Sequence, residues 1–142
     1  MAKIIVTGHG HFATGLKSTV ELLAGPQANM SFVDFTTGMD DVLLHTALQQ
    51  ALTPDTPTVF FCDLLGGTPF KQAVTLSTQV AQPIEVVAGA NVAALLEVAF
   101  TLADATDADA LADQLVSASQ QALTHFKLKK PVAEPDADED GI

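Results

Sequence analysis

Short runs of β-branched and aromatic residues alternate with longer stretches of helical periodicity, and this alternation limits the folds open to the chain. Strands are predicted where the apolar character is continuous, at residues 3–7, 31–35, 58–62 and 84–88. Helices are predicted where apolar residues recur every three or four positions, at residues 11–24, 40–52, 68–79, 91–102 and 107–125. A chain of 142 residues with this order is expected to fold as one α/β domain.

The same alternation restricts the topology. Crossovers between parallel strands are right-handed and place helices on both faces of the sheet. We therefore expect a doubly wound, mainly parallel four-stranded sheet with the strand order 2-1-3-4. In such sheets ligands bind beyond the carboxyl ends of the strands, where the strand order reverses. The ends of the first and third strands are neighbours at that point, so functional residues are expected there.

The charge balance excludes two classes of partner. The chain has six lysines, no arginine and seventeen acids, and its formal net charge is −11. Without clustered lysine and arginine it is not expected to bind nucleic acid or an anionic membrane surface. Five of the acids follow Pro131, so residues 131–142 are predicted to be an acidic, disordered tail and residues 3–130 the folded domain. The domain keeps twelve acids against six lysines, a net charge of −6, and is expected to attract a basic protein partner.

Nothing in the sequence predicts export or membrane insertion. No apolar run approaches the ~18 residues of a membrane span, and the N-terminus lacks the charged, apolar and small-residue regions of a signal peptide. The single cysteine, Cys62, cannot form an internal disulfide, so a cytoplasmic location is expected. Because Cys62 falls on the predicted third strand, we interpret it as a core residue rather than a nucleophile.

The end of the first predicted strand carries a histidine between two glycines, Gly8-His9-Gly10. The glycines allow a sharp turn and leave the imidazole uncovered. A neutral imidazole is a good nucleophile toward phosphorus when its tautomer leaves a lone pair on the attacking nitrogen. Asp63, at the end of the third strand, is the candidate carboxylate that fixes this tautomer and balances the positive charge that the ring gains.

The segment Gly66-Gly67-Thr68-Pro69 follows the same strand end and opens the third predicted helix. Thr68 is predicted to be the N-cap of this helix and Pro69 its first residue. Free N–H groups at a helix start bind anions, and glycines let a ligand approach the backbone closely. A phosphoryl group on this arginine-free chain would be held by backbone N–H groups, threonine hydroxyls and the partner protein. The candidate phosphoryl-binding loop comprises Gly8, Gly10, Gly66 and Gly67.

Each of these features also has a purely structural interpretation. His9 would then be an ordinary loop residue, GGTP a turn with a helix cap, and Asp63 the cap of a turn. A metal site formed by His9, His11 and Asp63 matches no strong ligand signature, and neither a metal nor a cofactor is predicted. A dinucleotide site fits poorly because the third glycine falls at position 15, and the sequence has no P-loop motif. His45 and His125 are interpreted as surface or boundary residues of helices.

Taken together, these motifs resemble the IIA component of the mannose-type (mannose, fructose, sorbose, N-acetylgalactosamine) sugar phosphotransferase system. The matching segments are IIVTGHGHFATGL, SFVDF, FFCDLLGGTPF and IEVVAGANVAALLE, and the resemblance covers residues 3 to about 126. GHG after the first strand, together with D-x-x-G-G-[ST]-P-F after the third, is specific to this family. In one departure, Leu65 stands where the family often has an aromatic residue, which is expected to alter partner contacts more than chemistry.

The resemblance implies that His9 is phosphorylated. In the family this histidine takes a phosphoryl group from the histidine phosphocarrier protein HPr and gives it to a IIB component, which phosphorylates sugar as it enters through membrane IIC and IID components. Asp63 would hydrogen-bond the nonphosphorylated ring nitrogen, and Thr68 would lie near the phosphoryl group. The protein would be a phosphotransferase without a cofactor. Because the sequence ends at Ile142 with no fused IIB domain, IIB is expected to be a separate protein.

Three other functions are compatible with the sequence. The related phosphocarrier of the dihydroxyacetone kinase system shares the fold and the histidine, but GGTPF fits the sugar-transport branch better. A non-catalytic regulatory module of the same fold and a small metal-dependent hydrolase are the others. The sequence does not identify the transported sugar, because the sugar contacts the membrane components.

The end of the chain predicts a homodimer. In the segment FKLKK at residues 126–130 apolar residues alternate with lysines, a period of two that suits a short edge strand, and Pro131 follows. The resemblance implies that this fifth, antiparallel strand is exchanged between subunits, which is a low-cost route to a symmetric dimer. The alternative is that residues 126–130 are the frayed end of the fifth helix, with lysines near its C-terminal dipole.

Overall fold

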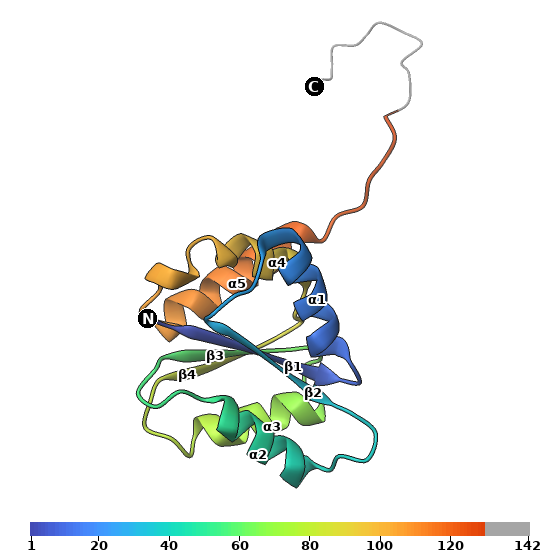
Figure 1. Cartoon of the computed structure of the whole chain (residues 1–142). Helices are drawn as coiled ribbons and strands as arrows, with labels where there is room; N and C mark the ends of the chain where they lie inside the picture. The colour runs from blue at the N-terminus through green and yellow to red at the C-terminus, as the bar shows by residue number, and fades with distance from the viewer. Residues whose placement is uncertain (130–142) are drawn as a thin grey trace, which may run out of the picture.

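The computed structural model describes residues 1–129 and contains the expected alternation of strands and helices (Figure 1). In chain order the elements are β1 (Lys3–His9), α1 (Phe12–Ala24), β2 (Met30–Phe35), α2 (Asp41–Ala51), β3 (Thr58–Cys62), α3 (Thr68–Ser77), β4 (Ile84–Ala88), α4 (Val92–Ala99), η1 (Leu102–Asp104) and α5 (Ala108–Ala122). The strands pair in parallel in the order β2-β1-β3-β4. The predicted doubly wound sheet with the order 2-1-3-4 is therefore confirmed.

Helices cover both faces of the sheet. α1, α4 and α5 lie on one face, and α2 and α3 lie on the other (Figure 1). Alternate residues of β1 point to opposite faces of the sheet, since Ile4 and Val6 belong to one apolar core and Ile5 belongs to the other. Among the described residues 1–129, no helix has the length and apolar character needed to cross a membrane.

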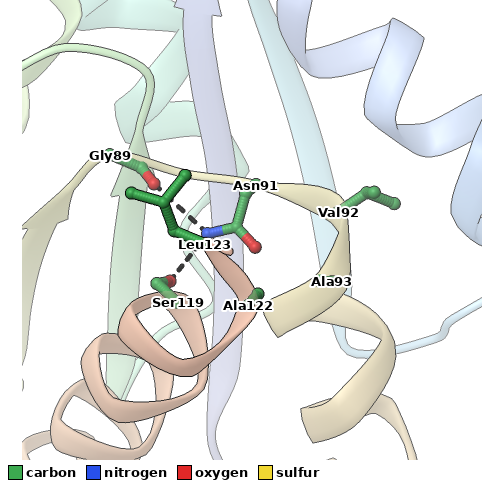
Figure 2. Close-up of a pocket in the computed structure, with 7 residues that line it drawn as sticks. All are labelled: Gly89, Asn91, Val92, Ala93, Ser119, Ala122 and Leu123. Carbon is green, nitrogen blue, oxygen red and sulfur yellow. Dashed lines mark hydrogen bonds between the residues drawn. The ribbon is translucent and has the colours of Figure 1, made fainter. Parts of the chain in front are cut away.

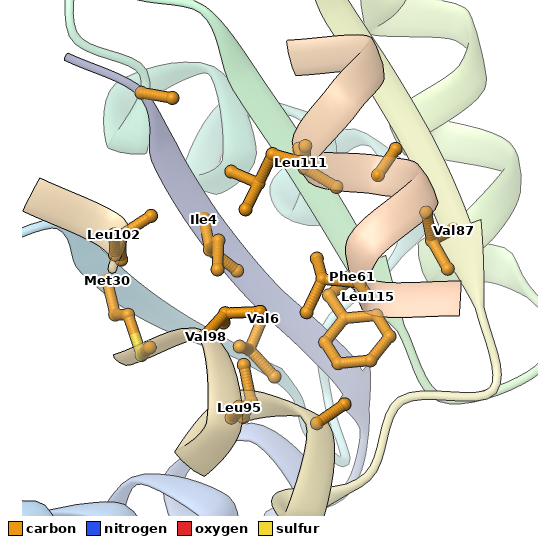
Figure 3. Packing of buried hydrophobic residues seen from close by; sticks show 14 of the residues in the cluster. Ile4, Val6, Met30, Phe61, Val87, Leu95, Val98, Leu102, Leu111 and Leu115 are labelled. Atoms are coloured by element: carbon orange, nitrogen blue, oxygen red, sulfur yellow. The ribbon is translucent and has the colours of Figure 1, made fainter. Parts of the chain in front are cut away.

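The larger core joins the central strands to three helices. Figure 3 shows Val6 and Phe61 of β1 and β3 near Leu95 and Val98 of α4 and Leu115 of α5. All five side chains are fully buried. Burying one large apolar side chain contributes about 1.5–3 kcal/mol. This core therefore fixes β1 and β3, whose carboxyl ends carry the predicted site.

The cap of α3 and the end of α4 differ from the prediction because of local backbone geometry. Gly67, not Thr68, is the N-cap of α3, since its backbone is extended (φ −73, ψ 170) and Thr68 is already helical. Pro69 is consequently the second helical residue rather than the first. The predicted helix at 91–102 ends earlier, at Ala99, because Thr101 leaves the helical region (φ −120) and a separate 3-10 turn follows.

α5 also ends earlier than predicted, at Ala122 instead of residue 125, because Leu123 adopts an extended backbone (φ −85, ψ 113). Residues 123–129 have no regular secondary structure, so within the described residues the segment neither continues α5 as helix nor forms a strand. Phe126 and Leu128 are 81% and 80% exposed. Within residues 1–129 no fifth strand is formed, and exchange of such a strand between subunits stays a prediction. Lys130 and the predicted tail lie outside the described residues.

Candidate functional site

His9 is the last residue of β1, and Asp63 directly follows β3. These strands are neighbours, with Thr7 opposite Cys62 in the register. The N–H of Asp63 continues the ladder by donating to the carbonyl oxygen of Thr7 at 3.1 Å. The two side chains that the sequence assigns to adjacent strand ends are thus brought together by the sheet itself.

The Asp63 carboxylate holds His9 through two hydrogen bonds to one oxygen. The ring Nδ1 lies 2.8 Å from Oδ2, and the backbone N–H of His9 donates to the same oxygen at 2.9 Å. The other oxygen, Oδ1, accepts from the N–H of Leu64 at 2.9 Å. Burial raises the pKa of Asp63, but the hydrogen bonds and charge of His9 and the hydrogen bond from Leu64 outweigh it and keep this pKa below its ordinary value. The carboxylate is therefore ionised at neutral pH.

An ionised carboxylate at Nδ1 selects the tautomer of His9. Because a carboxylate only accepts hydrogen bonds, Nδ1 carries the proton and Nε2 keeps its lone pair. The imidazole is 43% exposed, whereas the Asp63 side chain is only 9% exposed. The site thus has an accessible nitrogen nucleophile backed by a shielded negative charge.

Gly67 brings the start of α3 against the imidazole. A Cβ atom placed on Gly67 would lie 2.8 Å from Cε1 of His9 and 3.5 Å from Nε2. The first of these separations is shorter than any side chain tolerates, so only glycine permits this approach. The nucleophilic side of the ring therefore faces the N-terminus of α3.

The first turn of α3 offers unpaired donors on that side. Its first intrahelical hydrogen bond runs from the N–H of Lys71 to the carbonyl of Gly67 at 2.9 Å. The N–H groups of Thr68 and Phe70 precede it and have no partner within the helix, and Pro69 has no N–H. Such a helix start favours an anion. The contact of Thr68 with a phosphoryl group stays a prediction.

The remaining glycines have different roles in the geometry. A Cβ atom on Gly8 would lie 2.6 Å from Cδ2 of Phe12 and 2.8 Å from Cγ of Asp63, so close packing requires glycine there. Gly10 and Gly66 have φ values of +61 and +81, which favour glycine, and open space around them. Contact of these glycines with a phosphoryl group is not tested by the geometry and stays a prediction.

Two residues at the end of β2 complete the surroundings and are missed by the sequence analysis. The ring of Phe35 packs edge-on to that of His9, with centroids 5.8 Å apart at 67°. Asp34 lies opposite Gly8 in the register and contacts Thr14 and His11. The signal that could have found them is SFVDF, because β2 flanks β1 in the predicted order and ends at the same edge of the sheet.

The other candidate nucleophiles and ligands lie outside this pair. Cys62 is buried, and burial together with the charge of Asp63 raises the pKa of its thiol to about 12, which confirms a core role. His45 is partly buried on α2 and donates from Nδ1 to Oε1 of Gln72 at 3.2 Å. His125 lies beyond the end of α5 and not on it.

His11 does not join His9 and Asp63. Its Nδ1 lies 3.2 Å from Oδ2 of Asp34 instead. Among residues 1–129 no group of three or more histidine, cysteine or acidic side chains is arranged to hold a metal ion.

A pocket of about 330 Å³ lies between the start of α4 and the end of α5 (Figure 2), and His9 is not among its lining residues. Its main polar group, the Asn91 amide, donates to the carbonyl of Gly89 at 3.3 Å and to Oγ of Ser119 at 2.7 Å. The Asn91 carbonyl caps α4 by accepting from the N–H of Ala94. Since these groups are already paired, the pocket offers little chemistry, and the site rests on His9 and Asp63.

Comparison with known proteins shows the family of the chain. The model of the family described as "PTS system fructose IIA component" (EIIA-man) matches residues 3–116. The chain belongs to this family. The resemblance stated from the sequence is thereby confirmed, and the dihydroxyacetone kinase and regulatory alternatives are not favoured. Members of the family are phosphotransfer components of sugar uptake.

Individual relatives lie in several branches of the family. The fructose-specific EIIA component of Bacillus subtilis (strain 168) is 33% identical over 102 residues, 69% of this chain and 68% of its own length. The mannose-specific EIIAB component of Escherichia coli (strain K12) is 30% identical over 129 residues, 89% of this chain but only 40% of that protein. The sorbose-specific EIIA component of Lacticaseibacillus casei is 33% identical over 99 residues, 68% of this chain and 71% of its own length.

Solved structures share the fold of this IIA-family chain closely. The phosphotransferase system component EIIA from Streptococcus agalactiae superposes with a TM-score of 0.84 at 32% identity, covering 89% of this chain and 98% of that one. The mannose/sorbose-specific IIA subunit from Enterococcus faecalis superposes with a TM-score of 0.82 at 28% identity, covering 92% and 98%.

Proposed function

We propose that this protein is a phosphocarrier in which Nε2 of His9 accepts a phosphoryl group from phospho-HPr and passes it to a IIB component. One observation carries the proposal above the others. The ionised Asp63 lies 2.8 Å from Nδ1 of His9, while the opposite side of the ring faces the start of α3 at Gly67.

The transfer needs no general base in this geometry. The Nε2 lone pair attacks phosphorus, the Nε2–P bond forms, and the N–P bond to the donor imidazole breaks and leaves its electron pair on the donor nitrogen. The Nδ1 proton stays between His9 and Asp63, so the positive charge that the ring gains lies beside a carboxylate. Transfer to IIB reverses these steps with a new acceptor.

The phosphoryl oxygens would be held without arginine. The N–H groups at the start of α3 and the Thr68 hydroxyl are the candidate donors on this chain, and the partner protein supplies the rest. Donors that are already in place stabilise the transition state because they need no rearrangement during transfer. Gly8, Gly10, Gly66 and Gly67 shape this loop.

The partners follow from the proposed role. HPr is the donor, IIB is the acceptor, and the membrane IIC and IID components take part only indirectly. We take residues 3–130 as the IIA domain, within which the family match covers residues 3–116. The one cysteine is buried and free, in keeping with the cytoplasmic location inferred from the sequence.

Labelling with phosphoenolpyruvate, enzyme I and HPr tests this function. The wild-type protein should carry one acid-labile phosphate, and His9→Ala should carry none. His11→Ala is the matched control and should still be labelled, since His11 is not placed against α3. An acid-labile phosphate on His9→Ala would overturn the assignment.

A further inference from the structure

Asp34, at the end of β2, is the centre of a second polar cluster at the same edge of the sheet. Its side chain is 14% exposed. It accepts hydrogen bonds from the N–H of Thr14 at 3.0 Å and from the Thr14 hydroxyl at 2.6 Å. Nδ1 of His11 lies 3.2 Å away on the same carboxylate. All three donors come from the start of α1, so one carboxylate joins β2 to that helix.

α1 has no cap of its own. Its N-cap residue, His11, makes no side-chain capping hydrogen bond, and its first turn contains no acid. By contrast, α2, α4 and α5 are capped by their own N-cap side chains, Asp40, Asn91 and Asp107. Asp34 therefore caps the N-terminus of α1 from β2, as the N-cap side chains of the other helices do locally. Its negative charge also complements the dipole of α1.

The carboxylate is held in its charged form. Burial raises the pKa of Asp34, but the hydrogen bonds from Thr14 and the contact with His11 outweigh this and keep the pKa below its ordinary value. The arrangement parallels that of Asp63, which joins β3 to the end of β1 on the other side.

A chain of close contacts leads from α1 to the phosphotransfer pair. Phe12, the first residue of α1, and the Asp63 side chain both crowd the space beside Gly8, where a Cβ atom would lie 2.6 Å from Cδ2 of Phe12 and 2.8 Å from Cγ of Asp63. Only Gly10 and His11 separate β1 from α1, and the N–H of Gly10 donates to the carbonyl of Phe35 at 2.7 Å. A displacement of the first turn of α1 would therefore disturb the close packing beside Gly8, which Asp63 shares, and the two-residue link to His9.

We propose that Asp34 is a positioning residue for phosphotransfer, which holds the first turn of α1 through Thr14 and His11 and thereby keeps Asp63 and His9 in register. This role rests on the proposed function of His9 as the phosphoryl acceptor. It also predicts that geometry matters more than charge. The amide of Asn can still accept from the N–H of Thr14, so Asp34→Asn should recover most of what Asp34→Ala loses.

Two measurements on the full chain test this role. The first is single-turnover transfer from phospho-HPr over a range of donor concentrations. Asp34→Ala should slow transfer at saturating donor about tenfold and change the apparent donor affinity less than twofold, because misplacement affects the reacting geometry rather than docking. The second is nitrogen NMR of the His9 ring, where Asp34→Ala should shift signals away from the Nδ1–H tautomer. Asp34→Asn should stay within threefold of the wild-type rate.

Asp107→Ala is the matched control, since Asp107 caps α5 by accepting from the N–H of Asp109 at 3.0 Å. It should lower the melting temperature but leave transfer and the His9 signals unchanged. If Asp34→Ala fails to fold, Thr14→Ala removes only the hydroxyl donor and should slow transfer two- to threefold. Wild-type transfer and wild-type ring signals in the folded Asp34 or Thr14 variant would overturn the role. Labelled His9→Ala would instead overturn the proposed function, while the ring signals would still report whether Asp34 positions His9.

Discussion

Asp63 acts on His9 at two levels, because one of its oxygens accepts from both the ring and the backbone of the same residue. The hydrogen bond to the ring selects the tautomer, and the hydrogen bond from the backbone N–H holds the backbone of His9 in place. The second oxygen is anchored by the N–H of Leu64. A substitution at Asp63 therefore alters the chemistry and the position of the nucleophile together.

Replacing Asp63 with Asn should slow transfer about 100-fold, the size typical of a well-placed orienting or acid–base group. The amide cannot balance the charge of the phosphorylated ring, and its NH₂ group can turn toward Nδ1 and favour the wrong tautomer. Single-turnover transfer from phospho-HPr measures this effect. Asp113→Asn, on an exposed position of α5, is the matched control and should transfer like wild type. Unchanged kinetics in Asp63→Asn would remove Asp63 from the mechanism.

Gly67→Ala should slow transfer about 10- to 100-fold with little loss of stability. The new Cβ would lie 2.8 Å from Cε1 of His9 and must displace the ring, and small misplacements of reacting groups cost that much. The backbone of Gly67 (φ −73) is ordinary for any residue, so no strain is added. Gly15→Ala, which meets no atom within 4 Å, is the control. Equal transfer rates in the two variants would show that Gly67 does not limit the position of His9.

The sequence predicted His9 and Asp63 because their chemistry is distinctive and they fall on the two strand ends that meet where the strand order reverses. Asp34 and Phe35 were missed because an aspartate and an aromatic residue at the end of a flanking strand are ordinary. Their roles depend on a hydrogen bond to Thr14 and a ring contact with His9, both of which exist only in three dimensions.

At the scale of elements, the sequence predicted order and pairing better than boundaries. The strands at 58–62 and 84–88 agree with β3 and β4 because continuous apolar runs end at polar or glycine residues. Helix ends depend instead on the backbone of single residues. Gly67 is the N-cap of α3 although Thr68 has the side chain of a good cap, and α5 ends before Leu123 although the helix was predicted to continue to residue 125.

The two carboxylates at the carboxyl edge tie neighbouring elements together and should make the fold acid-sensitive. Burial raises the pKa of Asp63 and of Asp34, but their hydrogen bonds outweigh it, so both folded pKa values lie below the ordinary value. As the pH falls, the unfolded chain, with an Asp pKa of about 3.9, therefore binds protons at a higher pH than the folded chain does. This stability is present above that pH and is lost as the pH falls through the folded pKa values.

Urea unfolding at several pH values measures this dependence. Titration of these two groups should change the free energy of unfolding little between pH 7 and pH 5. Below about pH 4 their protonation should lower it. Asp34→Asn lacks one of the two titrating carboxylates and should show a smaller fall over the same acid range. A variant that loses stability as steeply as the wild type would show that Asp34 is not held in its charged form.

At the scale of the whole molecule, β4 is an open edge. Within the described chain it pairs with β3 alone. A groove of about 610 Å³ follows this strand and reaches the loop after β3, with Leu65, Phe70, Val86 and Val116 among its lining residues. An unpaired edge beside an apolar groove favours an added strand, because main-chain hydrogen bonds and apolar burial are both gained. Asp63 is also among the lining residues, so a strand added in this groove would lie near the site.

The segment after α5 has the pattern such an edge requires. Phe126 and Leu128 are almost fully exposed in the single chain, and Lys127 and Lys129 alternate with them. Paired with β4, the two apolar side chains would face one side of the strand and the lysines the other. We propose that this segment pairs with β4 of a second copy, which would leave the two chains symmetric and the β4 edge of each chain covered.

Light scattering on the full-length protein should therefore give the mass of a homodimer. A truncation ending at Thr124 removes the alternating segment and should be monomeric at the same concentration, because the open edge of β4 then has no strand to pair with. A truncation ending at Lys130 removes only the acid-rich residues 131–142 and should remain dimeric, which separates the effect of the segment from that of the tail. A monomeric full-length protein would contradict the dimer. Equal dimerisation of the Thr124 truncation would show that another surface joins the subunits.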